Sequence, residues 1–301
     1  MAGSIIHTDG LTKYFGKNRG VVGLELDVHE GEVFGYLGAN GAGKTTTIRM
    51  LLDIIRPTEG KATVFGLDSH KQSLEIRKDI GYLPGELALY DGMSGAEFLR
   101  YSSNLRGGSD HGFGFEIAER LSCDLARPVR DLSHGNKQKL GLIQAFMHRP
   151  RLIILDEPSQ GLDPLVQREF YTMVDEVKQE GCTVFLSSHV LPEAERVCDR
   201  VGFIRDGKMV AVERIEDMKA RALRYIEVKF EGQAPLDAIN SIKGVKGLLA
   251  DGDTLRFAVE GSIDSVIKAI AQYHVVNLVR READLEEMFM AYYERGGEIA
   301  G

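Results

Sequence analysis

The chain has 301 residues, of which 43% are hydrophobic and 27% charged, a composition typical of a soluble globular protein long enough for two domains. Its formal net charge of −8 argues against a grip of the whole protein on nucleic acid or anionic lipid. The three cysteines form no CxxC pair, which favours a reducing cytosolic compartment over a disulfide framework. The N-terminus does not resemble a signal peptide, and no apolar run approaches the roughly 18 residues that span a bilayer, so another chain would supply any membrane part.

Four short and nearly continuous apolar runs, at 32–38, 151–157, 183–189 and 200–207, predict parallel strands buried on both faces. In the first three, polar residues or glycine begin where the apolar run stops. Ligands of open α/β sheets bind beyond the carboxyl ends of the strands, so these three ends predict one site. The RDGK stretch in the fourth run predicts a hairpin turn and a final strand.

The first run leads into GANGAGKTT, residues 38–46, which has the spacing of a phosphate-binding P-loop. Glycines let backbone N–H groups point at phosphates, and the helix that follows directs the positive end of its dipole at them. Lysine adds a point charge, and the hydroxyl of Thr45 suits Mg²⁺. A preceding strand and a following apolar helix favour a nucleotide site over a mere glycine-rich turn. The predicted nucleotide contacts are Gly38, Ala39, Asn40, Gly41, Ala42, Gly43, Lys44, Thr45 and Thr46.

Residues 88–148 have helical periodicity and predict a helical subdomain inserted between strands. Its last helix begins in LSHGNKQKL, residues 132–140, where the hydroxyl of Ser133 suits an N-cap. Capping does not explain Gly135, because glycine near a helix start costs stability unless something must approach the backbone closely.

The second and third strand ends carry acidic and imidazole side chains. Asp156 ends the apolar part of LIILDEP and is predicted to hold Mg²⁺, directly or through water. Glu157 follows it, where a carboxylate could polarise an attacking water. His189 lies just past the third run, where its imidazole could bond a γ-phosphate and steady that water; a lone histidine elsewhere is more often structural.

After about residue 218 the order of predicted elements becomes β-α-β-β-α-β, which suggests a ferredoxin-like unit. A closing helix is predicted over ADLEEMFMAYYE, residues 283–294. The predicted domains are therefore 1–217, with the helical subdomain inside it, and 218–301.

Taken together, the motifs resemble those of the ATP-binding subunits of ABC (ATP-binding cassette) transporters. They occur in the family's order over about residues 11–210: LTKYFG, GANGAGKTT, GYLP, LSHGN, LIILDEP, SQGLDP and SSH. The tail LEEMFMAYY is similar to that of prokaryotic drug- and antibiotic-export ATPases of this family. The implied fold is α/β, a P-loop ABC cassette whose mostly parallel sheet is joined by antiparallel N-terminal strands and a helical subdomain, followed by a small α+β ferredoxin-like domain.

The resemblance also implies a head-to-tail pair of cassettes, with each ATP between the P-loop of one and the LSHGN loop of the other. Ser133, Gly135 and Asn136 would then bind nucleotide across the pair, and Gly135 would let the backbone approach the γ-phosphate. Asp163 of SQGLDP matches the loop that contacts the opposite site. Tyr14 matches the aromatic residue that stacks on adenine, although it could equally be a buried strand residue.

Two stretches depart from the family's pattern. The family usually reads LSGGQ where this chain has His134 and Asn136, but the serine and the second glycine remain, so contact with phosphate is still expected. The family places a glutamine at about Gly85 to sense the metal and to couple to the membrane partner. Gly85 has no side chain, and the neighbouring Glu86 could serve as a metal ligand only if the loop shifts.

The predicted function is Mg-ATP hydrolysis that energises an exporter, with Glu157 as general base, His189 as γ-phosphate partner and Lys44 as electrostatic clamp. The expected partners are a second copy or a homologous cassette and a transmembrane permease, without nucleic acid, on the cytoplasmic face of the membrane. The alternative is a soluble ABC ATPase acting on nucleic acid or ribosomes, which the short helical insert, the single P-loop and the net acidity disfavour. A GTPase or small-molecule kinase is disfavoured because no NKxD-like motif occurs.

Overall fold

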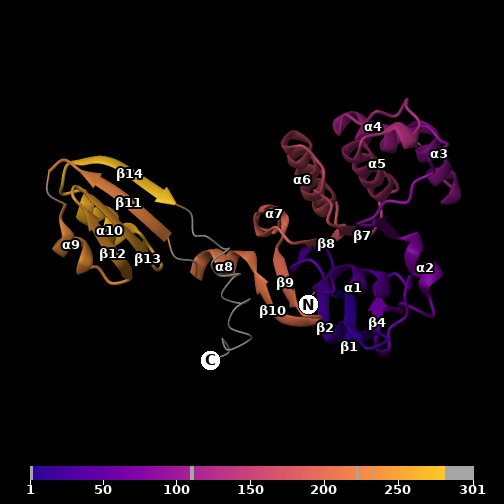
Figure 1. Ribbon diagram of the computed structural model, residues 1–301, viewed down its shortest axis with the longest axis horizontal. Coiled ribbons are helices and arrows are strands. Elements are labelled where there is room, and N and C mark those ends of the chain that lie inside the picture. Colours follow the sequence, from indigo (N-terminus) through magenta and orange to yellow (C-terminus); the bar gives the residue numbers. More distant parts are fainter. Residues whose placement is uncertain (1–2, 109–111, 222–223, 233, 282–301) are drawn as a thin grey trace. The chain divides into compact units, whose positions relative to one another are not determined.

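The computed structural model describes residues 3–108, 112–221, 224–232 and 234–281. The chain divides between Glu213 and Arg214 into two compact units, each with its own hydrophobic core (Figure 1). Within the described residues, no helix combines the length and the apolar character needed to cross a bilayer. The helix predicted over 283–294, including the tail motif LEEMFMAYY, lies outside the described residues.

A six-stranded sheet in the order β10-β9-β3-β8-β7-β6 carries the P-loop, LIILDEP and SSH motifs at the ends of its strands. The pairs β3–β8, β3–β9, β7–β8 and β6–β7 are parallel, as the buried apolar runs predict. Asp206 and Gly207 both have positive φ, 52° and 74°, and form the predicted turn from β9 into β10. Because β3, β8 and β7 are neighbours, the three polar strand ends meet at one edge of the sheet. The strands are β3 (Val33–Leu37), β6 (Ile80–Leu83), β7 (Leu152–Asp156), β8 (Thr183–Ser188), β9 (Arg200–Arg205) and β10 (Lys208–Arg214).

One face of this sheet packs with an antiparallel sheet in the order β2-β1-β4-β5 and with helix α1 around a common core. In that core the ring of Phe185 lies 5.9 Å from Phe34 and 5.4 Å from Tyr36, and all three side chains are fully buried. A large apolar side chain buried in this way contributes about 1.5–3 kcal/mol, which makes the strands a rigid support for their ends. The elements are β1 (Ser4–Phe15), β2 (Asn18–His29), α1 (Lys44–Leu51), β4 (Glu59–Val64), β5 (Leu67–Asp68) and the outlying α2 (Ser73–Lys78).

Helices α6 (Pro164–Gln179) and α7 (Leu191–Val197) cover the other face of the parallel sheet. At Gly35 in β3, an added Cβ would lie 2.9 Å from Cys198 Sγ and 3.4 Å from Ala194 Cβ. Glycine at this position therefore lets α7 pack directly on the backbone of β3. This close packing brings the first turn of α7 near the strand ends.

The predicted helical subdomain consists of α3 (Gly95–Leu105), α4 (Gly112–Arg120), the short 3₁₀ helix η1 (Val129–Asp131) and α5 (His134–Phe146). Helix α5 packs on β6, where a Cβ at Gly81 would overlap the Ala145 carbonyl. Arg120 at the end of α4 pairs with Glu169 and Glu176 of α6, at 2.6 and 2.7 Å. These ion pairs connect the subdomain with a helix of the parallel-sheet layer.

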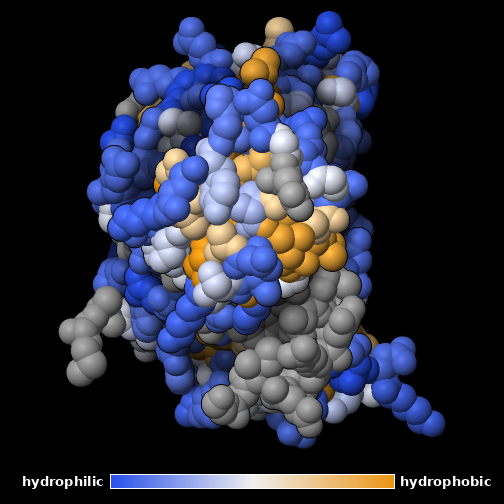
Figure 2. Space-filling view, turned by 90° about the vertical axis from the view of Figure 1, so that its left-hand side faces the viewer, coloured by the Kyte–Doolittle hydropathy of each residue, from blue (hydrophilic) through white to orange (hydrophobic). Residues whose placement is uncertain are grey.

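The second unit has the β-α-β-β-α-β order expected of a ferredoxin-like fold, with an antiparallel sheet in the order β12-β13-β11-β14. Helices α9 and α10 share its core with alternate residues of the strands. Figure 2 shows apolar side chains gathered among polar ones on the surface of this unit. The elements are α8 (Ile215–Arg221), β11 (Arg224–Phe230), α9 (Leu236–Asn240), β12 (Val245–Asp251), β13 (Thr254–Val259), α10 (Asp264–Ile270) and β14 (Val275–Arg281).

Candidate active site

Residues 38–43 form the loop between β3 and α1, and residues 44–46 form the first turn of α1. Gly43 is the N-cap of α1 and has φ of 112°, a conformation that favours glycine, and a Cβ there would lie 2.8 Å from the Gly20 carbonyl oxygen. A Cβ at Gly38 would overlap the Ile204 carbonyl. No side-chain oxygen caps α1, so its first N–H groups and the positive end of its dipole are available to an anion.

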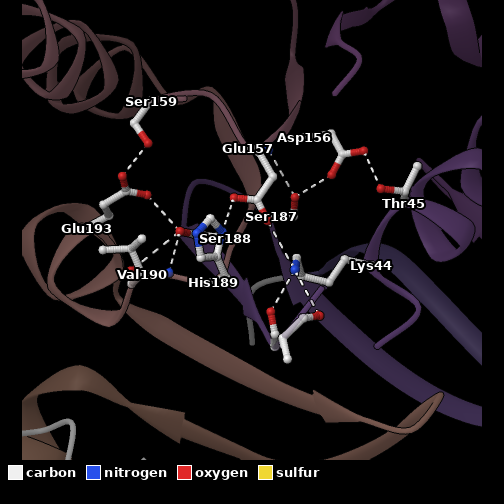
Figure 3. Close-up of polar contacts among 12 residues, drawn as sticks. Lys44, Thr45, Asp156, Glu157, Ser159, Ser187, Ser188, His189, Val190 and Glu193 are labelled. Carbon is white, nitrogen blue, oxygen red and sulfur yellow. Dashed lines mark hydrogen bonds and ion pairs between the residues drawn. The ribbon is translucent and has the colours of Figure 1, made fainter. Parts of the chain in front are cut away.

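Lys44 is the first residue of α1, and its side chain is only 6% exposed. Its ammonium donates to the carbonyl oxygens of Gly38 at 2.6 Å and Ala39 at 3.3 Å, and it pairs with Glu157 Oε1 at 3.1 Å (Figure 3). The lysine therefore places a fixed positive charge between the loop and the end of β7.

Asp156, the last residue of β7, is buried and accepts hydrogen bonds on both carboxylate oxygens (Figure 3). The Thr45 hydroxyl donates to Oδ2 at 2.7 Å, and the Ser187 hydroxyl donates to Oδ1 at 2.5 Å. Burial raises the pKa of the nearby Tyr82 to about 12, and the negative charge of Asp156 adds to that shift. The three strand ends thus bring Thr45, Asp156 and Ser187 together.

Glu157 has a left-handed backbone, with φ of 52°, which is unusual for a residue other than glycine. Its N–H donates to the carbonyl and to the hydroxyl oxygen of Ser187, at 3.2 and 3.1 Å. Oε2 contacts His189 Nδ1 at 2.8 Å, whereas the buried Oε1 has only the ion pair with Lys44 and accepts no hydrogen bond from the described residues. The turn therefore aims a carboxylate with an unused acceptor oxygen at the same place as Lys44 and His189.

The donor set fits a magnesium ion shared with phosphates. The Thr45 hydroxyl and the Asp156 carboxylate are hard oxygen ligands, and Mg²⁺ in nucleotide enzymes takes few protein ligands. The described part of the chain has no group of three or more His, Cys, Asp or Glu side chains that could hold a metal. Gly85 lies beside Asp156 Oδ2, where an added Cβ would be 3.2 Å away, so the missing side chain leaves room beside this carboxylate, while Glu86 is exposed.

The LSHGN loop makes its hydrogen bonds away from the P-loop. Ser133 is the predicted N-cap of α5, and its hydroxyl accepts from Asn136 N at 3.3 Å and from Asn136 Nδ2 at 3.2 Å. A Cβ at Gly135 would lie 2.7 Å from the Gly161 carbonyl oxygen, so close packing within the chain already requires glycine there. Asp163 is exposed and caps α6 by accepting from Leu165 N and Val166 N at 3.1 and 3.0 Å. The start of α5 and the loop at 159–163 therefore lie against each other at Gly135 and Gly161.

Comparison with known proteins decides the family. The profile of the family described as ABC transporter matches residues 21–160. The bacitracin transport ATP-binding protein BcrA of Bacillus licheniformis is 37% identical over 76% of each chain, and its namesake of Enterococcus faecalis is 32% identical over 98% of each chain. This chain belongs to the ATP-binding subunits of ABC transporters. It is an ABC-type ATPase that binds ATP and energises transport.

Further relatives agree with this assignment. The linearmycin resistance ATP-binding protein LnrL of Bacillus subtilis is 30% identical over 95% of this chain and 97% of its own. A solved ATP-binding subunit of an ABC transporter has a TM-score of 0.66 at 28% identity, covering 72% of this chain and 92% of that one. A dimeric bacterial ABC transporter cassette, at 20% identity and a TM-score of 0.65 over 70% and 98% of the chains, shares the fold. The predicted fold class and the transport function are confirmed, and the nucleic-acid alternative finds no support.

Several residues of the cassette that hold the site together were not predicted. Ser187 bonds both the Asp156 side chain and the Glu157 backbone, and Gln138 of α5 donates to the Pro158 carbonyl at 3.1 Å. The polar SSH sequence at the end of an otherwise apolar strand is a signal for Ser187. Gln138 has no comparable signal, because only the packing of α5 brings it to the chain beyond β7.

Two exposed aromatic residues, Tyr14 and Phe15, lie next to each other at the end of β1. The ring of Phe15 and the methyl group of Thr46 both lie against Gly20, which places Phe15 beside the first turn of α1. Tyr14 precedes it in the strand and so points to the opposite face, and its N–H donates to the Thr58 hydroxyl at 3.1 Å. Phe15 is therefore a second candidate, besides Tyr14, for an aromatic contact with a nucleotide base.

We predict that Phe15→Ala weakens ATP binding about tenfold, because stacking of a base on an aromatic ring is worth about 1–3 kcal/mol. Tyr14→Ala is the matched control and is expected to change the Kd by less than about twofold. Titration calorimetry of both variants with Mg-ATP measures the difference. A larger loss for Tyr14→Ala would assign the adenine contact to Tyr14 instead.

Proposed function

We propose that this chain is the ATP-hydrolysing subunit of an exporter of antibiotic- or drug-like compounds, working on the cytoplasmic face of the membrane with separate transmembrane subunits. The names of its relatives, bacitracin transport and linearmycin resistance, support this substrate class. The observation that carries the chemical part is the position of the Glu157 carboxylate, between Lys44 and His189 and next to the Asp156–Thr45 pair.

In this proposal the backbone N–H groups of residues 38–46 and the ammonium of Lys44 bind the ATP phosphates. Mg²⁺, held by Thr45 and Asp156, would neutralise phosphate charge when bound. Glu157 Oε1, which accepts no hydrogen bond from the described residues, accepts the proton of the attacking water as general base. Ser187 keeps Asp156 and the Glu157 backbone in place.

His189 connects the base to the phosphate. Its Nδ1 faces Glu157 Oε2 at 2.8 Å, which leaves Nε2 for a γ-phosphate oxygen. In this proposal one imidazole ring contacts the Glu157 carboxylate and the γ-phosphate at once.

A second cassette, either another copy or a homologue, completes the site in this proposal. Ser133, Gly135, Asn136 and Asp163 make their hydrogen bonds and close contacts away from the P-loop, while the Ser133 and Asp163 side chains are exposed. Contact with nucleotide would then have to come from the partner's ATP, with the N-terminus of α5 facing its γ-phosphate. We further propose that residues 1–217 are the cassette and that 218–301 form an accessory domain.

Mg-ATP-dependent association, measured by light scattering, tests the dimer. In the Glu157→Gln background, which preserves ATP, we expect ATP to convert monomers into dimers. Adding Ser133→Arg places a long charged side chain at the proposed contact and should abolish the dimer while ATP still binds. Hydrolysis by a monomer that neither change affects would overturn the paired site and leave only nucleotide binding.

A further inference from the structure

A carboxylate that belongs to none of the motifs bridges two loops of the candidate active site. Glu193 lies in the first turn of α7. Its Oε1 accepts from the Ser159 hydroxyl and its Oε2 accepts from the Ser188 hydroxyl at 2.7 Å (Figure 3). Ser159 lies two residues after Glu157, and Ser188 immediately precedes His189. One side chain thus holds both segments that carry the proposed base and its phosphate-binding partner.

At the β8 end, Glu193 orients the turn that contains His189. The Ser188 hydroxyl donates to Glu193 and accepts from Val190 N at 2.9 Å, closing a local turn around His189. Ser188 is fully buried, whereas the His189 side chain is 45% exposed. Because packing holds the imidazole only weakly, its position depends on this turn and on its contact with Glu157.

At the β7 end, Glu193 holds the start of the loop at 159–163. The Ser159 carbonyl accepts from Leu162 N at 3.1 Å, which folds the loop back toward α6. Gly161 in the same loop lies against Gly135 of the LSHGN loop. The hydroxyl contact with Glu193 therefore connects the proposed dimer-facing surface with the His189 turn.

The chemistry of the bridge requires a carboxylate. Both serines donate, and only an ionised carboxyl group offers two acceptor oxygens and no donor. Glutamine would place an N–H₂ group against one of the hydroxyls. Of the ion pairs made by the described residues, none includes Glu193, so hydrogen bonding to the two serines, not charge pairing, accounts for its position.

We propose that Glu193 is a positioning residue for ATP hydrolysis, which sets the distance between Glu157 and His189 by tying Ser159 to Ser188. This inference rests on the proposed roles of those two residues. Removing the bridge should lower kcat with little effect on ATP affinity, because Glu193 touches neither the P-loop nor the Asp156–Thr45 pair. A small misplacement of reacting groups can reduce a rate by as much as about a hundredfold.

The test compares Glu193→Gln with the wild-type chain and with Glu180→Gln, the same change at an exposed residue where α6 ends. We expect Glu193→Gln to lower kcat for Mg-ATP at least about tenfold, with the Kd for ATP within about twofold of wild type, and Glu180→Gln to change neither. If Glu193→Gln does not fold, the test uses Ser159→Ala instead, which removes a single hydroxyl of the bridge. Because Glu193 acts through both serines, the losses in Glu193→Gln and Ser159→Ala should not add in the double variant.

The outcomes separate the two proposals. A wild-type chain without Mg-ATP turnover would overturn the proposed function and, with it, the role of Glu193. A wild-type chain that hydrolyses ATP while Glu193→Gln keeps its full kcat would overturn the role of Glu193 alone. Additive losses in the double variant, or a Kd that rises in step with the fall in kcat, would assign Glu193 to the general stability of the fold.

Discussion

Glu157→Gln is expected to lower the turnover of Mg-ATP by about 10²–10⁴-fold, the typical contribution of general base catalysis. Glutamine keeps the shape of the side chain but cannot take a proton from water, and Oε1 of Glu157 is the carboxylate oxygen that accepts no hydrogen bond from the described residues. ATP binding should persist, because the loop amides and Lys44 are unchanged. Phosphate release under steady-state conditions and titration with ATP measure the two quantities.

The control for this variant is Glu180→Gln, which removes one negative charge at an exposed position far along α6 and should keep the wild-type rate. Because Glu157→Gln also removes the ion-pair partner of Lys44, whose side chain is only 6% exposed, the thermal midpoint should fall, and activity is compared well below it. A Glu157→Gln protein that turns over ATP at the wild-type rate would show that another group activates the water.

Lys44→Met is expected to weaken ATP binding about a hundredfold, because a charge-assisted contact with phosphate is lost from a buried site, a loss of about 2–3 kcal/mol. The same change removes the ion-pair partner of Glu157, whose side chain is only 17% exposed. Leaving a partly buried charge with one partner fewer destabilises the fold. Titration calorimetry and urea unfolding follow binding and stability separately.

The double variant Lys44→Met/Glu157→Gln separates the two effects of Lys44. Removing the carboxylate as well eliminates the unpaired charge, so the double variant should be more stable than Lys44→Met, although it binds ATP no better. The 3.1 Å separation of Lys44 and Glu157 indicates a stabilising ion pair. A double variant that is less stable than Lys44→Met would contradict that contribution.

Local patterns in the sequence were sufficient for much of the fold. The apolar runs at 32–38, 151–157 and 183–189 are strands in the predicted parallel arrangement, because a strand covered on both faces needs an uninterrupted apolar sequence. The β-α-β-β-α-β order of the second unit followed in the same way from alternation and turn residues. The boundaries were less certain: α1 ends at Leu51, before the end of the apolar stretch TIRMLLDII, where the left-handed Asp53 turns the chain.

The sequence by itself determined the P-loop, the acidic end of β7 and the histidine after β8, because each depends on residue types at fixed short spacings. Only the tertiary structure decided which distant side chains meet: Phe15 beside the first turn of α1, Gly135 against Gly161, and Glu193 between Ser159 and Ser188. These contacts join segments that are far apart along the chain, and the packing of whole helices and strands brings them together. No local spacing encodes such a contact, since the free energy that creates it comes from burying whole helix and strand faces.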